Sequence, residues 1–135
     1  MTGVILFVLG AVVGSFLNVV GLRWDSGRTL LGRSSCPSCG KSLKWWELVP
    51  ILSFFILKAR CRECQSKISW QYPLIELWAG LIFVTIPYVF IPVFCIYIVI
   101  TIYDLRHKII PDTLVYTSIL LALIFRSISG GSLLD

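Results

Sequence analysis

One uncharged stretch decides the fold of this chain: GVILFVLGAVVGSFLNVVGL, residues 3–22. About 20 apolar residues are enough to cross the hydrocarbon core of a bilayer as a helix. A secretory signal peptide is the rival interpretation, but no basic region precedes the run and no clear small-residue cleavage site ends it. We therefore predict that residues 1–22 form a first transmembrane helix. Asn18 within it should face protein and not lipid.

Gly10 and Gly14 in the same stretch have the small-xxx-small spacing that lets two membrane helices approach closely. The alternative is the ordinary glycine content of a membrane helix. The sequence leaves both interpretations open.

The composition of the whole chain agrees with a membrane protein. Its 135 residues are 57% hydrophobic and 14% charged, with a mean hydropathy of +0.88, whereas a soluble domain averages about 45–50% apolar and about 25% charged residues. The net charge of +5 is then better explained by topology than by nucleic-acid binding, because basic residues collect in cytoplasmic loops. We expect an all-α integral membrane protein that does not bind nucleic acid.

Residues 23–72 form a polar loop that carries most of the basic side chains. The positive-inside rule applies to a loop of this length, so we place it in the cytoplasm and the N-terminus outside. Trp24, Trp45, Trp46 and Trp70 are typical of an interfacial aromatic belt around it. The basic residues are Arg23, Arg28, Arg33, Lys41, Lys44, Lys58, Arg60, Arg62 and Lys67.

Within the loop, residues 48–57 carry no charge. Ten residues are too few to span a bilayer. The segment either lies at the membrane interface and packs the loop onto it, or fills the core of a small domain; the sequence does not choose between these.

The loop also holds two C-x2-C pairs, Cys36/Cys39 and Cys61/Cys64. Two such pairs complete a tetrahedral thiolate site, and their spacing is close to that of zinc ribbons. Gly40 would ease the first turn. Neighbouring Lys41, Arg60, Arg62 and Lys67 would offset the thiolate charge. Disulfides and thiol redox chemistry are the rival interpretations. Four cysteine ligands leave no open position on the ion, so we predict a structural zinc site in a zinc-ribbon-like cytoplasmic loop.

Residues 73–103 are almost wholly apolar, and Glu76 is their one charge. A single helix would be about 45 Å long, so we expect two short helices with a break between Pro87 and Pro92. Residues 109–125 form the last apolar run, and the tail after Arg126 reads as a loop. These segments give about four transmembrane helices, with residues 73–135 as a membrane domain.

Four ionisable residues in this half are candidates for chemistry. Asp104 ends one apolar run and Asp112 precedes the next; two nearby carboxylates can share a proton and activate water. Asp104 could instead pair with Arg106 or Lys108, and we favour an N-cap role for Asp112. Glu76 either complements a helix dipole or acts within the membrane. His107 reads as a solvated interfacial residue.

Several motifs together resemble the type IV prepilin peptidases, which are membrane aspartic leader peptidases of the A24 type. They occur in the order of that family and cover nearly the whole chain. They are Gly14-Ser15-Phe16-Leu17-Asn18-Val19-Val20 with Arg23 after it, the two C-x2-C pairs, Trp46-Glu47-Leu48-Val49-Pro50, Tyr72-Pro73-Leu74-Ile75-Glu76-Leu77 and the stretch 104–112.

The resemblance implies a function. Members cleave the basic leader of type IV prepilins or pseudopilins at the cytoplasmic face of a bacterial or archaeal-type plasma membrane, after a glycine. Many also methylate the new N-terminus with S-adenosylmethionine. The first catalytic aspartate of the family maps to Asp104, and the four cysteines map to its zinc-binding loop.

The chain also departs from the family pattern. The second catalytic aspartate lies in a Gly-x-Gly-Asp motif, which these 135 residues do not contain, and the run between Pro73 and Asp104 is shorter than is usual. We therefore expect an N-terminal portion of the peptidase whose missing half comes from a second chain, a second copy or a continuing reading frame. The alternative is a non-catalytic membrane protein whose zinc module binds prepilins or assembly partners.

Overall fold

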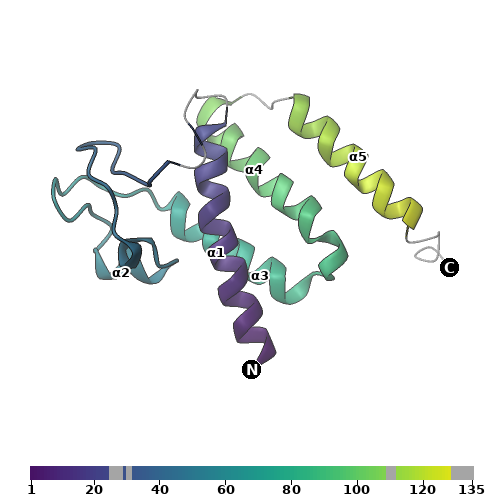
Figure 1. Cartoon of the computed structure of the whole chain (residues 1–135), viewed down its shortest axis with the longest axis horizontal. Helices are drawn as coiled ribbons and strands as arrows, with labels where there is room; N and C mark the ends of the chain where they lie inside the picture. The colour runs from purple at the N-terminus through teal and green to yellow at the C-terminus, as the bar shows by residue number, and fades with distance from the viewer. Residues whose placement is uncertain (25–28, 30–31, 109–111, 129–135) are drawn as a thin grey trace.

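The computed structural model describes residues 1–24, 29, 32–108 and 112–128, and this part of the chain is helical with two isolated β-bridges. The α-helices are α1 (Thr2–Arg23), α2 (Leu52–Ile56), α3 (Gln71–Thr85), α4 (Ile91–His107) and α5 (Asp112–Ile128). Two 3-10 helices, η1 (Trp45–Leu48) and η2 (Tyr88–Phe90), complete the order. Figure 1 shows α1, α3, α4 and α5 side by side, with the loop between α1 and α3 folded as a separate lobe on one flank.

Among the described helices, α1 and α3 pack against each other most extensively, and they run antiparallel. A Cβ atom built on Gly10 would lie 2.6 Å from the backbone oxygen of Ala79, and one on Gly14 would lie 2.7 Å from the Ala79 Cβ. No larger side chain fits at either position without moving the backbones apart. The small-xxx-small interpretation of Gly10 and Gly14 is therefore confirmed as a helix-packing site.

The apolar core lies where α1, α3, α4 and α5 meet. Its most buried members, Ala79, Ile98 and Ile102, are at most 1% exposed. Asn18 is 1% exposed, and its side-chain amide donates to the Tyr72 backbone oxygen at 3.4 Å. Asn18 faces protein, as predicted.

The apolar run 73–103 folds as two helices, as expected from its length. α3 ends at Thr85, and the chain turns through η2 into α4 with Pro92 in the first turn, where the missing proline N–H has no helical partner to lose. At the other end, α5 continues to Ile128. The prediction that a loop begins after Arg126 was therefore wrong by two residues; residues 129–135 lie outside the described part.

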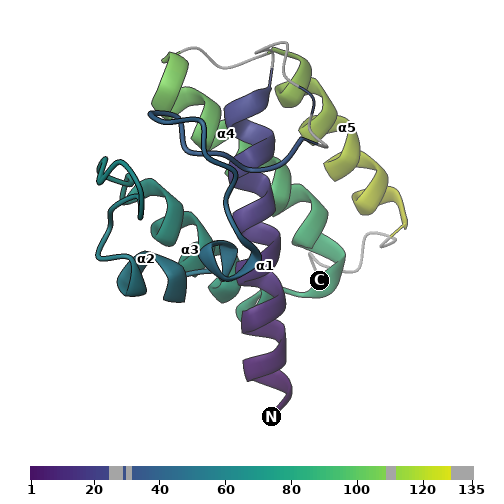
Figure 2. The same cartoon turned by 60° about the vertical axis from the view of Figure 1, so that its left-hand side comes forward.

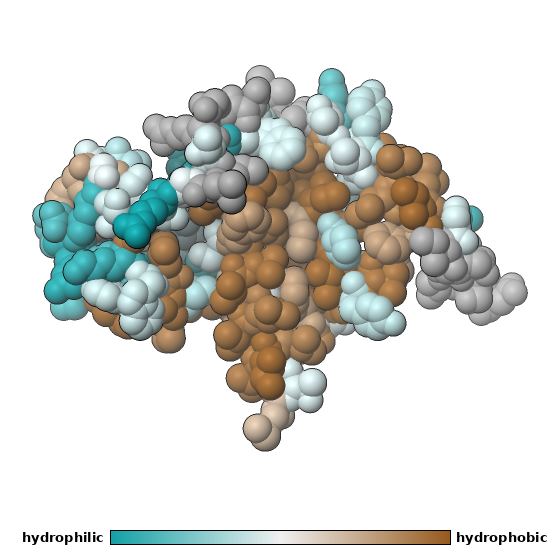
Figure 3. Space-filling view, in the orientation of Figure 1, coloured by the Kyte–Doolittle hydropathy of each residue, from teal (hydrophilic) through white to brown (hydrophobic). Residues whose placement is uncertain are grey.

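Two helical segments are long and apolar enough to cross a membrane, namely Thr2–Arg23 and Tyr88–His107. α3 and α5 have 15 and 17 residues and fall short of that length, so the expected four crossings stay a prediction. Figure 3 shows apolar side chains covering the visible surface of α1 and the neighbouring helices, while hydrophilic residues gather on the lobe. The division into segments 1–22, 23–72 and 73–135 likewise stays a prediction.

The lobe, here called the cysteine module (residues 32–70), has a small core of its own. Phe54 of α2 is 5% exposed, and its ring packs edge-on against Trp70 with 4.7 Å between centroids. Arg23 at the end of α1 ties down the start of the module, because its guanidinium donates to the backbone oxygens of Thr29, Gly32 and Arg33 at 2.8–3.1 Å. Figure 2 shows the module beside α1 and α3.

Candidate metal centre and membrane-edge carboxylates

The four predicted ligands, Cys36, Cys39, Cys61 and Cys64, come together in the cysteine module. Their Sγ atoms all lie within 4.8 Å of one another, and those of Cys36 and Cys64 are 3.7 Å apart. Thiolates bound to one tetrahedral zinc at about 2.3 Å lie about 3.8 Å from each other, whereas a disulfide requires about 2.05 Å. All four cysteines are free thiols. The cluster is therefore consistent with a zinc site, and the disulfide alternative does not describe this structure.

Two similar turns build the cluster. In the first, the Gly40 amide donates to the Cys36 oxygen at 2.9 Å; in the second, the Gln65 amide donates to the Cys61 oxygen at 3.1 Å. Both turns need a left-handed residue, which is Gly40 (φ +72°) in the first and Gln65 (φ +57°) in the second. A bridge closes each turn, Ser35 with Ser42 and Arg60 with Lys67. The glycine made the first turn predictable, and nothing in the sequence marked Gln65.

The thiols of the cluster differ in acidity. Backbone amides of Cys39 and Ser38, with the Ser66 hydroxyl, lower the pKa of Cys36 to about 6. The Lys41 amide also lowers the pKa of Cys39, but desolvation and the neighbouring cysteine sulfurs outweigh it and raise that pKa to about 11. Four sulfurs this close resist full ionisation unless a cation joins them, so the donor set suits a metal that takes thiolates.

An ion pair joins the two turns. Lys41 Nζ lies 2.9 Å from Glu63 Oε1, and the side-chain hydrogen bond between them raises the pKa of Lys41 and lowers that of Glu63. Lys41 therefore cannot offset the thiolate charge in full, because its positive charge is partly neutralised by Glu63. Ser66 was missed: its Oγ lies 3.1 Å from the Cys64 Sγ.

Replacing Gly40 by Ala should weaken metal binding. No atom lies within 4 Å of a Cβ built there, but the φ of +72° is one that L residues rarely adopt. The strain of about 1–2 kcal/mol corresponds to a roughly 5–30-fold weaker zinc complex, measured by competition with a chelator. Gln65→Gly removes strain and is the control, which should bind at least as tightly. An unchanged affinity for Gly40→Ala would contradict this account of the turn.

Asp104 lies in the last turn of α4 and is exposed. Its backbone oxygen accepts from the Lys108 amide at 2.8 Å, and Lys108 ends the helix in a left-handed conformation. Among the residues that the structure describes, no ion pair joins Asp104 to Arg106 or Lys108, so the pairing alternative finds no support. His107 is exposed, as expected, and stacks on Tyr103 with 4.4 Å between ring centroids.

Asp112 is the first residue of α5 and is also exposed. Four residues separate α4 from α5, and the last three of them, 109–111, lie outside the described part. A capping role for Asp112 stays a prediction. Asp104 lies at the same end of the bundle as the C-terminal end of α1. A Cβ atom built on Gly21, near the end of α1, would lie 2.6 Å from Ile102, two residues before Asp104. The module is attached at that end of α1 (Figure 1).

The structure does not place Glu76 at the start of a helix, as one of its two predicted roles requires. α3 begins at Gln71, and no acidic residue lies in its first turn, so the dipole interpretation was wrong. The side chain is 7% exposed, and its Oε2 accepts from the Ile51 amide at 2.7 Å. Sequence reasoning also missed Glu47, which is 7% exposed and accepts from the Lys44 amide at 2.8 Å.

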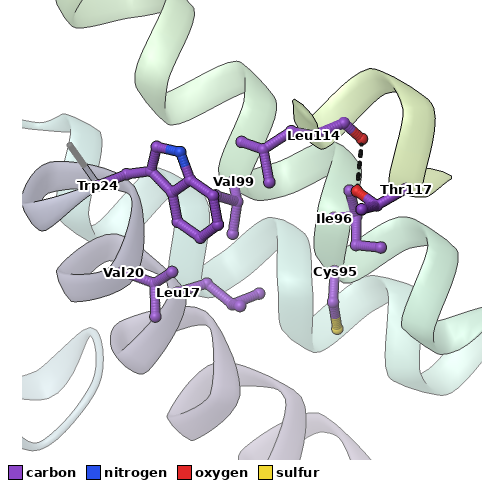
Figure 4. A pocket seen from close by; sticks show the side chains of 8 residues that line it. All are labelled: Leu17, Val20, Trp24, Cys95, Ile96, Val99, Leu114 and Thr117. Carbon is purple, nitrogen blue, oxygen red and sulfur yellow. Dashed lines mark hydrogen bonds between the residues drawn. The ribbon is translucent and has the colours of Figure 1, made fainter. Parts of the chain in front are cut away.

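An apolar pocket of about 280 Å³ lies between α1, α4 and α5. Figure 4 shows Trp24 and Leu17 on one side of it and Cys95 on another. The Thr117 hydroxyl at its edge donates to the Leu114 oxygen at 2.9 Å and is therefore satisfied. No carboxylate lines the pocket, which separates it from the candidate catalytic residue.

The fold and the cluster define a class: a helical protein with two membrane-length apolar helices and a four-cysteine cluster consistent with a zinc site. Residues 8–90 match the bacterial peptidase A24 N-terminal domain. The chain belongs to that family.

Three curated relatives carry the same name. Prepilin leader peptidase/N-methyltransferase of Myxococcus xanthus is 53% identical over 81 residues, which are 59% of this chain and 24% of the relative. The proteins of the same name from Neisseria gonorrhoeae and Bacillus subtilis are 33% and 41% identical, over 92% and 58% of this chain and 55% and 32% of their own lengths. The chain thus spans about a quarter to half of these relatives. No solved structure matches it.

Proposed function

We propose that this chain is the N-terminal part of a prepilin leader peptidase in the plasma membrane. Such an enzyme removes the basic leader of type IV prepilins or pseudopilins at the cytoplasmic face. Family membership and the names of the relatives support the proposal. The observation that carries it is the position of Asp104, which lies at the polar end of α4 and at the same end of the bundle as the attachment of the cysteine module.

The proposed chemistry is hydrolysis of one peptide bond by two carboxylates. Asp104 is one of them. The other comes from a Gly-x-Gly-Asp segment, in a further part of the same protein or in a second chain. The ionised carboxylate takes a proton from water as the water oxygen attacks the carbonyl carbon, while the protonated one donates to the carbonyl oxygen. The carboxyl group that took the proton from water then gives it to the amide nitrogen, and the C–N bond breaks. The leader leaves with a new carboxyl end, and the mature pilin keeps the amine.

The proposed metal is one structural zinc on Cys36, Cys39, Cys61 and Cys64. The ion would hold the module folded. The second activity in the names of the relatives, N-methylation, would use S-adenosylmethionine; for this chain it is a separate part of the proposal, tested by transfer of a labelled methyl group to the processed pilin.

Processing of a prepilin tests the proposal. The protein, expressed from its complete reading frame in cells without their own prepilin peptidase, should convert a co-expressed prepilin to the shorter form, seen by mass spectrometry. A prepilin with valine in place of the glycine before the cleaved bond is the control and should stay intact. Wild-type prepilin that stays intact but co-purifies with the protein would favour the binding-only alternative.

The proposed orientation makes its own prediction. A cysteine at exposed Ser38 of the module should escape a membrane-impermeant thiol reagent in intact cells, because the module is proposed to be cytoplasmic. A cysteine at exposed Thr2, at the opposite end of α1, should react. Labelling is read by mass spectrometry of peptides. The reverse pattern would place the module outside.

A further inference from the structure

The strongest unexplained feature is the apolar segment 49–57 of the cysteine module, which contains α2. Only part of it fills the core of the module. Phe54 is buried, whereas Leu52, Phe55 and Ile56 are 61%, 60% and 74% exposed. Three large apolar side chains therefore lie together on the outside of a five-residue helix, with no described residues covering them.

The position of the segment along α1 gives its depth relative to the Arg23 end of that helix. The Ile51 amide is hydrogen-bonded to Glu76, and the Glu76 Cα lies 3.0 Å from a Cβ built on Gly14. Gly14 is nine residues before Arg23, about 14 Å along the helix, and the hydrocarbon half-thickness of a bilayer is about 15 Å. Figures 1 and 2 agree, since both place α2 level with the middle part of α1 and not with its Arg23 end.

Five backbone amides of the segment, including that of the non-helical Ile51, have hydrogen-bond partners within the protein. Non-helical backbone survives at membrane depth only where its polar groups find partners in the protein. Ile51 has a left-handed φ of 62°, and its amide is satisfied by the buried Glu76 carboxylate. The amides of Leu52, Ser53, Phe55 and Leu57 donate to backbone oxygens of residues 49–53 at 2.6–3.4 Å.

Charge also favours a membrane as the occupant. Lys58, Arg60 and Arg62 follow the segment and line the same groove as Ile56 and Leu57. None of the three forms an ion pair with another described residue. Interfacial membrane elements have this arrangement: their apolar side chains lie in the hydrocarbon, and their lysine and arginine side chains lie at the headgroups.

We propose that residues 49–57 form a re-entrant membrane element, with Leu52, Phe55 and Ile56 against lipid tails and Lys58, Arg60 and Arg62 at anionic headgroups. Glu76 holds the element in place by accepting the Ile51 amide at membrane depth. The cysteine module is thus partly sunk into the cytoplasmic leaflet, beside α1 and α3. This inference is independent of catalysis.

Site-specific photocrosslinking tests it. The full-length protein, with benzoylphenylalanine at position 55 or 56, is irradiated in nanodiscs that contain anionic phospholipid. Both positions should attach lipid as efficiently as position 8, where Val8 is 54% exposed on α1. Position 38 on the first cysteine turn should attach none. No lipid at 55 and 56, or crosslinks there to other protein segments, would overturn the proposal.

The unmodified protein gives a second test. Phe16 of α1 and Phe55 have matched exposures of 57% and 60%, so hydroxyl radicals from water should spare both in nanodiscs. Oxidation of Phe55 but not Phe16 would contradict the inference.

Two substitutions test whether Glu76 holds the element in place. Glu76→Gln keeps an acceptor oxygen for the Ile51 amide and should keep lipid crosslinking at position 55. Glu76→Leu removes the acceptor and should lose that crosslinking, while the cysteine cluster stays metal-loaded. Equal crosslinking in both variants would remove Glu76 from the account.

Discussion

Asp104→Asn is expected to abolish leader cleavage. The amide has nearly the shape of the carboxylate, but it can neither take a proton from water nor hold one for the carbonyl oxygen. In a serine protease, loss of the aspartate that orients the catalytic histidine costs roughly four orders of magnitude in kcat, and we expect a loss of at least that scale for a carboxyl group that itself transfers the proton. The measurement is the rate of conversion of a prepilin by membranes that contain the full-length protein.

Asp112→Asn is the matched control for that measurement. It removes a carboxylate of the same kind eight residues further on, in the first turn of α5. We propose that Asp112 stabilises the N-terminus of α5 through the helix dipole and the free backbone amides. Such an interaction contributes about 0.3–1 kcal/mol at the surface. Cleavage should therefore stay close to wild type. An equal loss of cleavage in both variants would indicate that Asp104 and Asp112 act together. That result would contradict the proposal that only Asp104 of this pair is catalytic.

Cys36→Ser is expected to have the second large effect. Cys36 is 6% exposed, and its Sγ atom lies 3.7 Å from the Sγ atom of Cys64 within the cluster. Four-thiolate zinc sites supply folding energy outright, with binding free energies of about 10–16 kcal/mol in small zinc modules. We expect about one zinc per chain in the wild type and loss of most of it in the variant, with faster proteolysis of residues 32–70.

Cys95→Ser is the control for the cysteine substitution. Cys95 lies on α4 and lines the apolar pocket away from the cluster. Its replacement should leave zinc content and protease resistance of the module unchanged, as measured by metal analysis and limited proteolysis. Zinc retained in Cys36→Ser, or no zinc in the wild type, would contradict the four-cysteine site.

Much of this fold could be predicted because its signals are local. The uncharged run gave α1, and the two prolines located the break between α3 and α4. The C-x2-C spacing predicted the cluster, because each turn needs only four neighbouring residues to place two sulfurs. The sequence also led to Asp104, through family motifs whose order is itself visible along the chain.

The rest depends on contacts between distant segments. Glu76 meets Ile51 across 25 residues, and neither position carries a local signal for that contact. The start of α3 was misjudged because the apolar run begins at Pro73, whereas the helix begins two residues earlier at Gln71. Gln65 adopts a left-handed conformation that its residue type does not favour, because the second cysteine turn requires it.

The proposed catalytic site lies at the polar end of the bundle, where α4 presents Asp104. The most direct measurement uses a prepilin that carries a photocrosslinker next to its leader glycine, bound to the inactive Asp104→Asn protein so that the substrate stays intact. We expect crosslinked peptides from residues 103–108, at the end of α4. Crosslinks at residues 86–90, in the turn at the opposite end of α4, would contradict it.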